Sequence, residues 1–227
     1  MDRKAQTQAV TAVLITGITV GAIASVYVWG TPILTKRQGQ ANIQQVQDQV
    51  VTLYEDIVST SRGGKGTASN IQLDFSNQNA NIEYVYVNPS EDYINLTLSS
   101  VQNSPYPTNT WTMVKGESLQ DISIGAGLYG IKGEELPGVV MVRPHGASAT
   151  GKLTYRIEFR NLYVDTASGE KLEKIDLQAQ GGNVAAGATT VRISNDGIRR
   201  DSGSSGVQLP SGERIDRDRT VIKVDLR

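Results

Sequence analysis

The sequence predicts an α+β protein in which a long N-terminal hydrophobic helix is followed by an all-β sandwich domain. Two patterns predict the helix. Charged residues are absent from Ala5 to Thr35, and from Gln38 to about Thr60 apolar residues recur three and four positions apart. A third pattern predicts the sandwich, because from Ile71 onward short apolar runs alternate with a period of two.

Composition excludes several classes of function. The 227 residues include no cysteine and one histidine, so the chain offers neither thiol chemistry nor a metal site with cysteine or paired histidine ligands. The net charge of −1 gives no basic surface for nucleic acid. Residues 1–37 carry four basic side chains and one acidic, a charge of +3, which leaves −4 for the remainder. We expect no catalytic residues, no enzyme activity, no cofactor, no metal and no nucleic-acid partner.

The charge-free run is long enough to cross a bilayer. About thirty residues of helix, at roughly 1.5 Å each, exceed a hydrocarbon core of roughly 30 Å. A cleaved secretory signal is one alternative, but the run is longer than the roughly 7 to 15 apolar residues of such signals and no Ala-x-Ala follows. A single-pass anchor is another, because Tyr27 and Trp29 precede Lys36 and Arg37 as interfacial aromatic residues do.

The run also carries a face of small residues. Gly17, Gly21 and Ser25 are spaced by four, so they lie above one another on one side of a helix. Such a face suits close contact between helices, and we expect helix–helix packing there.

The N-terminal junction leads to a third alternative. The stretch Arg3-Lys4-Ala5-Gln6-Thr7-Gln8, a short basic leader before an apolar helix, resembles the class III signal of archaeal type IV pilin-like proteins, which include the archaellin superfamily. The resemblance implies that residues 1–5 are a leader, that a leader peptidase cuts between Ala5 and Gln6, and that the helix stays in the mature subunit. It also implies the lollipop architecture of type IV pilins.

The function implied by this resemblance is structural. The chain would be a subunit of an extracellular, pilus-like filament, which is a helical homopolymer. The filament would adhere to surfaces or cells, with motility as a lesser alternative. Its partners would be further copies of itself, the membrane before assembly, the leader peptidase and the assembly machinery. The competing hypothesis is a single-pass, membrane-anchored β-sandwich that acts as a binding module at the cell surface and does not polymerise.

The helix is expected at 6–61, with an apolar half at 6–35 and an amphipathic half at 36–61. Pro32 should kink or briefly break it, because proline removes a backbone donor and clashes with the preceding turn. In the amphipathic half the apolar stripe predicts packing against a globular domain. The glycine-rich segment 61–66 should end the helix.

The head domain, expected at 67–227, is predicted to be an immunoglobulin-like sandwich of about eight to ten strands. The strand runs are 71–75, 82–87, 93–98, 110–114, 119–124, 138–143, 153–164, 173–180, 189–194 and 220–226.

A few positions in the head are candidates for turns or sites. Ser194 to Gly197 is predicted to be a turn, and 200–206 a flexible surface loop. His145 is expected in a surface turn, without partners for catalysis. The alternating charges at 216–219 are typical of a solvated charge ladder rather than a calcium loop. Asn95, in Asn95-Leu96-Thr97, is a candidate N-glycosylation site if it is exposed outside the cell.

Overall fold

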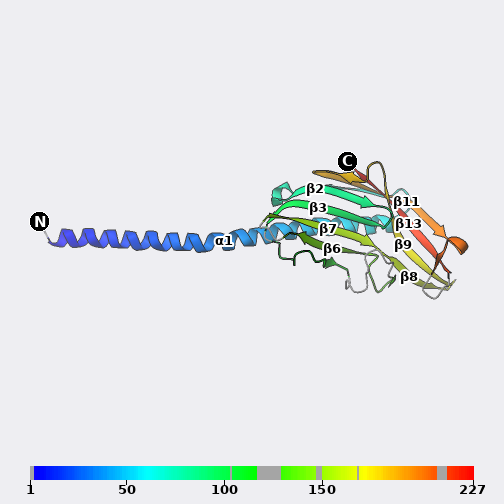
Figure 1. Ribbon diagram of the computed structural model, residues 1–227, viewed down its shortest axis with the longest axis horizontal. Coiled ribbons are helices and arrows are strands. Elements are labelled where there is room, and N and C mark those ends of the chain that lie inside the picture. Colours follow the sequence, from blue (N-terminus) through cyan, green and yellow to red (C-terminus); the bar gives the residue numbers. More distant parts are fainter. Residues whose placement is uncertain (1–2, 103, 117–128, 147–149, 168, 209–213) are drawn as a thin grey trace. The chain divides into compact units, whose positions relative to one another are not determined.

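The α+β prediction is confirmed: one long N-terminal helix precedes a domain of two β-sheets. The computed structural model describes residues 3–102, 104–116, 129–146, 150–167, 169–208 and 214–227 (Figure 1). The chain divides into two compact units, Met1–Ala41 and Asn42–Arg227, so the helix contributes to both. The expected strand at 119–124 lies outside the described residues.

Helix α1 runs from Arg3 to Arg62. It is continuous through Pro32, so the expected break is not observed, and the kink stays a prediction. The helix ends where the glycine-rich segment begins, and the amide of Gly63 still bonds to the carbonyls of Ser59 and Thr60, both at 3.2 Å.

The described strands and short 3-10 helices follow α1 in chain order. They are β1 (Ala68–Leu73), η1 (Ser76–Gln78), β2 (Asn81–Asn88), β3 (Tyr93–Gln102), β4 (Thr112–Lys115), β5 (Tyr129–Ile131), β6 (Gly138–His145), β7 (Thr150–Phe159), β8 (Asn161–Thr166), β9 (Gly169–Ala179), β10 (Val184–Ala185), β11 (Thr189–Asp201), η3 (Gly203–Ser205), β12 (Val207–Gln208) and β13 (Arg214–Leu226).

These strands form two sheets. The seven-stranded sheet has the order β1-β11-β13-β9-β8-β5, with β12 added beside β13, and the six-stranded sheet has the order β10-β2-β3-β7-β6-β4. Most neighbours are antiparallel, but β13 pairs with β9, and β5 with β8, in parallel. The run expected as one strand at 153–164 is two strands, because the chain passes from the six-stranded to the seven-stranded sheet at Arg160.

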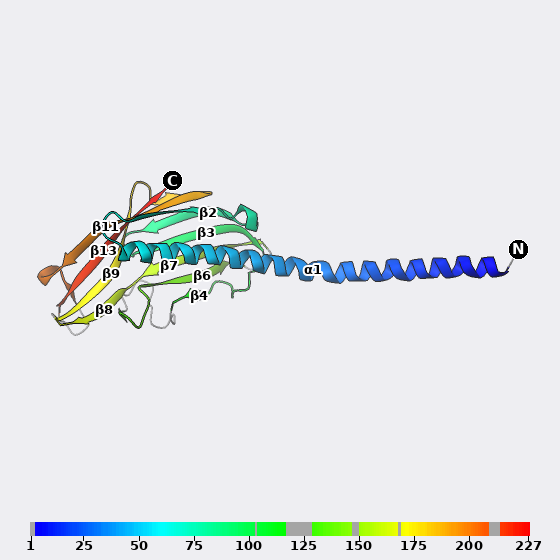
Figure 2. The same cartoon turned by 180° about the vertical axis from the view of Figure 1, so that it is seen from behind.

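The second half of α1 belongs to the core of the head domain. Its apolar stripe is at most 8% exposed and packs in one cluster with side chains from both sheets. The stripe consists of Ile43, Val46, Val50, Leu53, Tyr54, Ile57 and Val58. In Figure 2 this part of α1 lies along the six-stranded sheet, across β3 and β7. Burial of each such side chain stabilises the fold by roughly 1.5–3 kcal/mol.

A buried asparagine joins the end of α1 to the seven-stranded sheet. The amide nitrogen of Asn195, a residue only 4% exposed, donates to the carbonyls of Thr60 at 3.1 Å and Gly63 at 2.8 Å. Its carbonyl side-chain oxygen accepts from the amide of Gly197 at 2.7 Å. The predicted turn is therefore wrong: these residues form a bulge within β11, where Gly197 adopts φ 106°.

The loop expected at 200–206 begins inside a strand, and the charge ladder at 216–219 lies in a neighbouring strand. Arg200 and Asp201 lie in β11 rather than in a loop, and 216–219 lies inside β13. The Asp201 carboxylate bonds to Arg217 at 2.8 Å and to Arg219 at 2.9 Å, with side chains only 14–27% exposed. Cross-strand pairing, rather than solvation, therefore satisfies much of this charge.

Replacement of Asn195 tests the helix-end contact. Asn195→Ala removes a buried donor from the carbonyls of Thr60 and Gly63, and we expect the free energy of unfolding to fall by about 1–3 kcal/mol. Urea unfolding of the detergent-solubilised chain, followed by tryptophan fluorescence, measures this change. Asn70→Ala is the matched control, since Asn70 is exposed in β1; equal stability of the two variants would contradict the assigned role.

Candidate functional site

The first half of α1 presents an apolar surface that the chain itself does not bury. Every large apolar side chain described between Val13 and Leu34 is 56–79% exposed. These side chains are Val13, Leu14, Ile15, Ile18, Val20, Ile23, Val26, Tyr27, Val28, Trp29, Ile33 and Leu34. Exposure of so much apolar surface to water is unfavourable, at about 25 cal/mol per Å², so this segment requires a partner that covers it.

Hydroxyl groups within the apolar segment are satisfied inside the helix. Each donates a hydrogen bond to the backbone carbonyl four residues earlier, at 2.6–3.0 Å. The donors are Thr16, Thr19, Ser25, Thr31 and Thr35. Because these hydroxyls need no water, they lower the cost of placing the segment in an apolar environment.

The small-residue face is open. Apart from adjacent residues and the helix's own backbone, no atom lies within 4 Å of the position that a Cβ would take at Gly17 or Gly21. Ser25 keeps its hydroxyl on the backbone, where it bonds to the carbonyl of Gly21 at 2.9 Å. The face is thus a shallow, uncharged strip along which another helix backbone can approach closely. Helix–helix packing there stays a prediction.

One helix among the described residues is long and apolar enough to cross a membrane, and it contains this segment. Tyr27 and Trp29 are 73% and 79% exposed and precede Lys36 and Arg37. Aromatic rings followed by basic residues are typical of a membrane–water interface.

The backbone of the leader junction is part of α1. Ala5 and Gln6 are helical, and their side chains lie outside the described residues. Cleavage between them stays a prediction.

The candidate glycosylation residue does not meet its condition of free exposure. Asn95 is half-buried in β3, between β2 and β7, and its side-chain oxygen accepts from Arg156 Nε at 3.0 Å. Thr97, the third residue of the sequon, is 3% exposed and its hydroxyl bonds to that of Thr154 at 3.1 Å. Glycosylation of Asn95 would have to displace the Arg156 contact.

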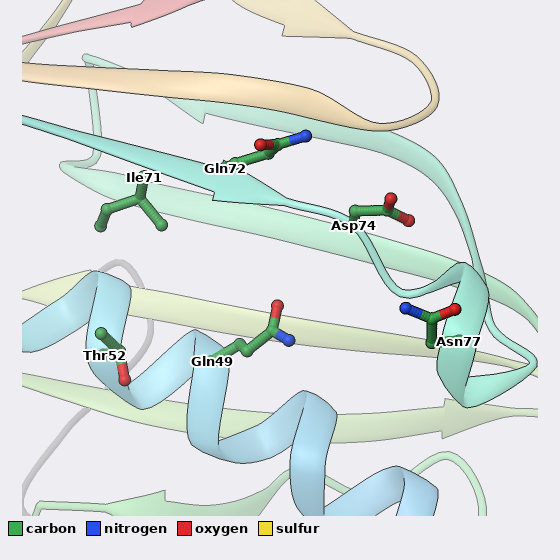
Figure 3. Close-up of a pocket in the computed structure, with 6 residues that line it drawn as sticks. All are labelled: Gln49, Thr52, Ile71, Gln72, Asp74 and Asn77. Atoms are coloured by element: carbon green, nitrogen blue, oxygen red, sulfur yellow. The ribbon is translucent and has the colours of Figure 1, made fainter.

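The head also contains a polar groove between α1 and β1, with a volume of about 350 Å³. Figure 3 shows its six lining residues, which come from α1, β1 and the segment through η1. They are Gln49, Thr52, Ile71, Gln72, Asp74 and Asn77. The groove's carboxylate, that of Asp74, accepts from the amide of Ser76 at 3.0 Å, which holds its pKa below the usual range. The Thr52 hydroxyl donates to the carbonyl of Asp48 at 2.8 Å, so this hydroxyl and the Asp74 carboxylate are both hydrogen-bonded within the chain.

A larger cavity of about 580 Å³ lies beside the end of α1, β8, β9 and segment 132–137. Several of its charged lining groups are paired: Lys132 bonds to Glu173 at 2.6 Å, and Glu135 lies 3.6 Å from Arg160. Among the described residues no group of three or more carboxylate or histidine side chains is placed to hold a metal ion.

His145 is at the end of β6 rather than in a turn. Its Nε2 lies 2.9 Å from the Thr154 hydroxyl, and burial, together with the charges of Arg143 and Lys152, lowers its pKa. These neighbours make it a neutral member of the sheet surface.

Comparisons of the chain with models of known protein families, with curated proteins and with solved structures found no match. The chemistry of the exposed helix therefore provides the basis for a functional interpretation.

A charge placed in the apolar segment tests its need for an apolar environment. Ile18→Lys places an ammonium group near the centre of the segment, at a cost of about 2.5–3.5 kcal/mol in a bilayer. We expect most of the membrane-bound fraction to be lost, as measured by alkaline extraction of membranes. Gln40→Lys, also exposed but beyond Arg37, is the control; equal retention of both variants would refute membrane insertion of the segment.

Proposed function

We propose that this chain is a structural subunit of an extracellular, archaeal type IV pilus-like filament that serves in adhesion. One observation carries the proposal: the apolar half of α1 is unburied, satisfies its own hydroxyls and bears an open small-residue face. The segment is inserted in the membrane before assembly and then packs against the same segment of neighbouring subunits. The β heads, each with its own core, form the outside of the filament.

Energetics favour two successive environments for one segment. Lipid and a bundle of apolar helices both remove the side chains from water, so moving between them retains the burial of roughly 0.8 kcal/mol per CH₂. A face with Gly17 and Gly21 adds close backbone contact, which lipid does not provide. A heterologous contact repeated between subunits produces an open helical polymer, rather than a ring, when its rotation does not close.

The second candidate is a single-pass anchored binding module at the cell surface. The positions of Tyr27 and Trp29 before Lys36 and Arg37 favour it, because a permanent anchor is expected to keep such residues at one interface. In this alternative the small-residue face has no partner.

The mature N-terminus and the assembly state distinguish the two candidates. Mass spectrometry of the chain purified from its membrane should give a first residue of Gln6 if leader processing occurs, whereas retention of Met1 would count against it. Electron microscopy of the natively extracted protein should show filaments. Detergent-soluble monomers without filaments would support the anchored module.

Substitutions on the small-residue face test its role in assembly. Gly17→Leu with Gly21→Leu fills the strip and should strongly reduce filament number in micrographs. Apart from adjacent residues and the helix's own backbone, no atom of the chain lies within 4 Å of a Cβ at either position. Ile23→Leu with Val26→Leu, on the opposite side of the helix, is the matched control and should assemble normally. Normal filaments from the double-leucine variant would show that the helices do not pack through this face.

A further inference from the structure

A buried lysine–aspartate pair connects the two sheets of the head. Asp92 lies in the connection between β2 and β3 of the six-stranded sheet, and Lys174 lies in β9 of the seven-stranded sheet. Lys174 Nζ is 2.6 Å from Asp92 Oδ2, and the two side chains are only 15% and 7% exposed. The pair therefore joins elements that are distant in sequence, and it is largely shielded from water.

Asp92 is held in place by backbone groups. Its second oxygen, Oδ1, accepts from the amide of Leu177 at 2.8 Å, and its main-chain carbonyl accepts from the amide of Phe159 at 3.0 Å. Its backbone has φ 53°, in the left-handed region that non-glycine residues adopt rarely. The carboxyl group is thus fixed against the lysine from both sheets.

Burial changes the pKa of the aspartate in this pair. Desolvation is the largest effect and raises the pKa of Asp92; the charge of Lys174 opposes this shift, and that of Asp176 adds to it. Amide formation requires that the Asp92 carboxyl is protonated before its hydroxyl group leaves, and the raised pKa of Asp92 favours this condition. The contact of 2.6 Å with Lys174 Nζ provides the donor of that proton.

We propose that Lys174 and Asp92 form an intramolecular isopeptide bond. The Nζ lone pair attacks the Asp92 carboxyl carbon and a C–N bond forms. The C–OH bond breaks, and the hydroxyl group leaves with one amine proton as water, so no oxidant or reductant is required. The Leu177 amide, which donates to the remaining oxygen, stabilises the negative charge that develops there.

Fixed geometry and restricted water favour this reaction over hydrolysis. Groups held in reactive positions have effective concentrations of about 10⁵–10⁸ M, far above those of free reactants. Lys174 also lines the 580 Å³ cavity, which can receive the released water. In a chain without cysteine, the bond would provide the covalent link between sheets that a disulfide provides elsewhere.

A second lysine–aspartate pair, Lys171 with Asp218, lies within the seven-stranded sheet and serves as a comparison for Lys174 with Asp92. Lys171 Nζ lies 2.8 Å from Asp218 Oδ2, but it also contacts Glu173 at 3.1 Å, and its side chain is 28% exposed. Hydrogen bonds to these carboxylates raise the pKa of Lys171, which opposes the loss of the proton that attack would require. We expect no bond at this pair.

Mass spectrometry of the full-length, purified protein tests the proposal. The chain, with its observed N-terminus taken into account, should be lighter than its sequence by the mass of one water. A tryptic digest should contain one branched peptide that joins the segments around Asp92 and Lys174. Lys174→Arg and Asp92→Ala should each restore the full mass, whereas the matched control Lys171→Arg should retain the deficit.

The wild-type mass decides the outcome even if a variant fails to fold. A full mass together with separate, unlinked peptides would show an ordinary ion pair and overturn the proposal. A deficit that maps to other residues, or that survives Lys174→Arg, would overturn it as well. Because this measurement concerns the head alone, its result is independent of whether filaments form.

Discussion

The structure of the head depends on the burial of the second half of α1. Its stripe of seven apolar side chains shares one core with both sheets, and the inner faces of those sheets would lack a cover without it. Asn195 adds a directional constraint, because it donates to the carbonyl of Thr60 in the last turn of the helix and to that of Gly63 just beyond it. The helix is therefore a core element of the domain rather than an attachment to it.

This arrangement has a mechanical consequence. Since α1 is continuous from Arg3 to Arg62, force applied to the apolar segment is carried by backbone hydrogen bonds into the core of the head. To pull α1 out would expose the stripe and break the contacts of Asn195 together. The head resists opening by means other than disulfides, namely Lys174 with Asp92 between the sheets and the Asp201 charges within one.

Local sequence patterns predicted the helix and most of the strands. The features that they did not predict depend on contacts between residues far apart in the sequence. The stripe from Ile43 to Val58 follows from helical periodicity, and most strands follow from alternation. The sheet change at Arg160 was not predictable, because an uninterrupted run at 153–164 contains no signal for which sheet each part joins. Asn195-Asp196-Gly197 has the composition of a turn, and only the register with β13 and the nearby helix end makes it a bulge. Asp92 and Lys174 stand 82 positions apart, so their contact depends wholly on the packing of the two sheets.

Lipid and a neighbouring helix favour different arrangements of side chains on the exposed half of α1. A bilayer favours apolar side chains on every side of a helix, and this preference does not depend on where the small residues lie. A neighbouring helix is sensitive to that position, since only small residues permit close backbone approach. Gly17, Gly21 and Ser25 lie on one side, while larger residues such as Ile23 and Val26 lie on the other. An anchor alone does not require this asymmetry, whereas a helix that leaves lipid to pack against copies of itself does, and this difference favours the filament subunit.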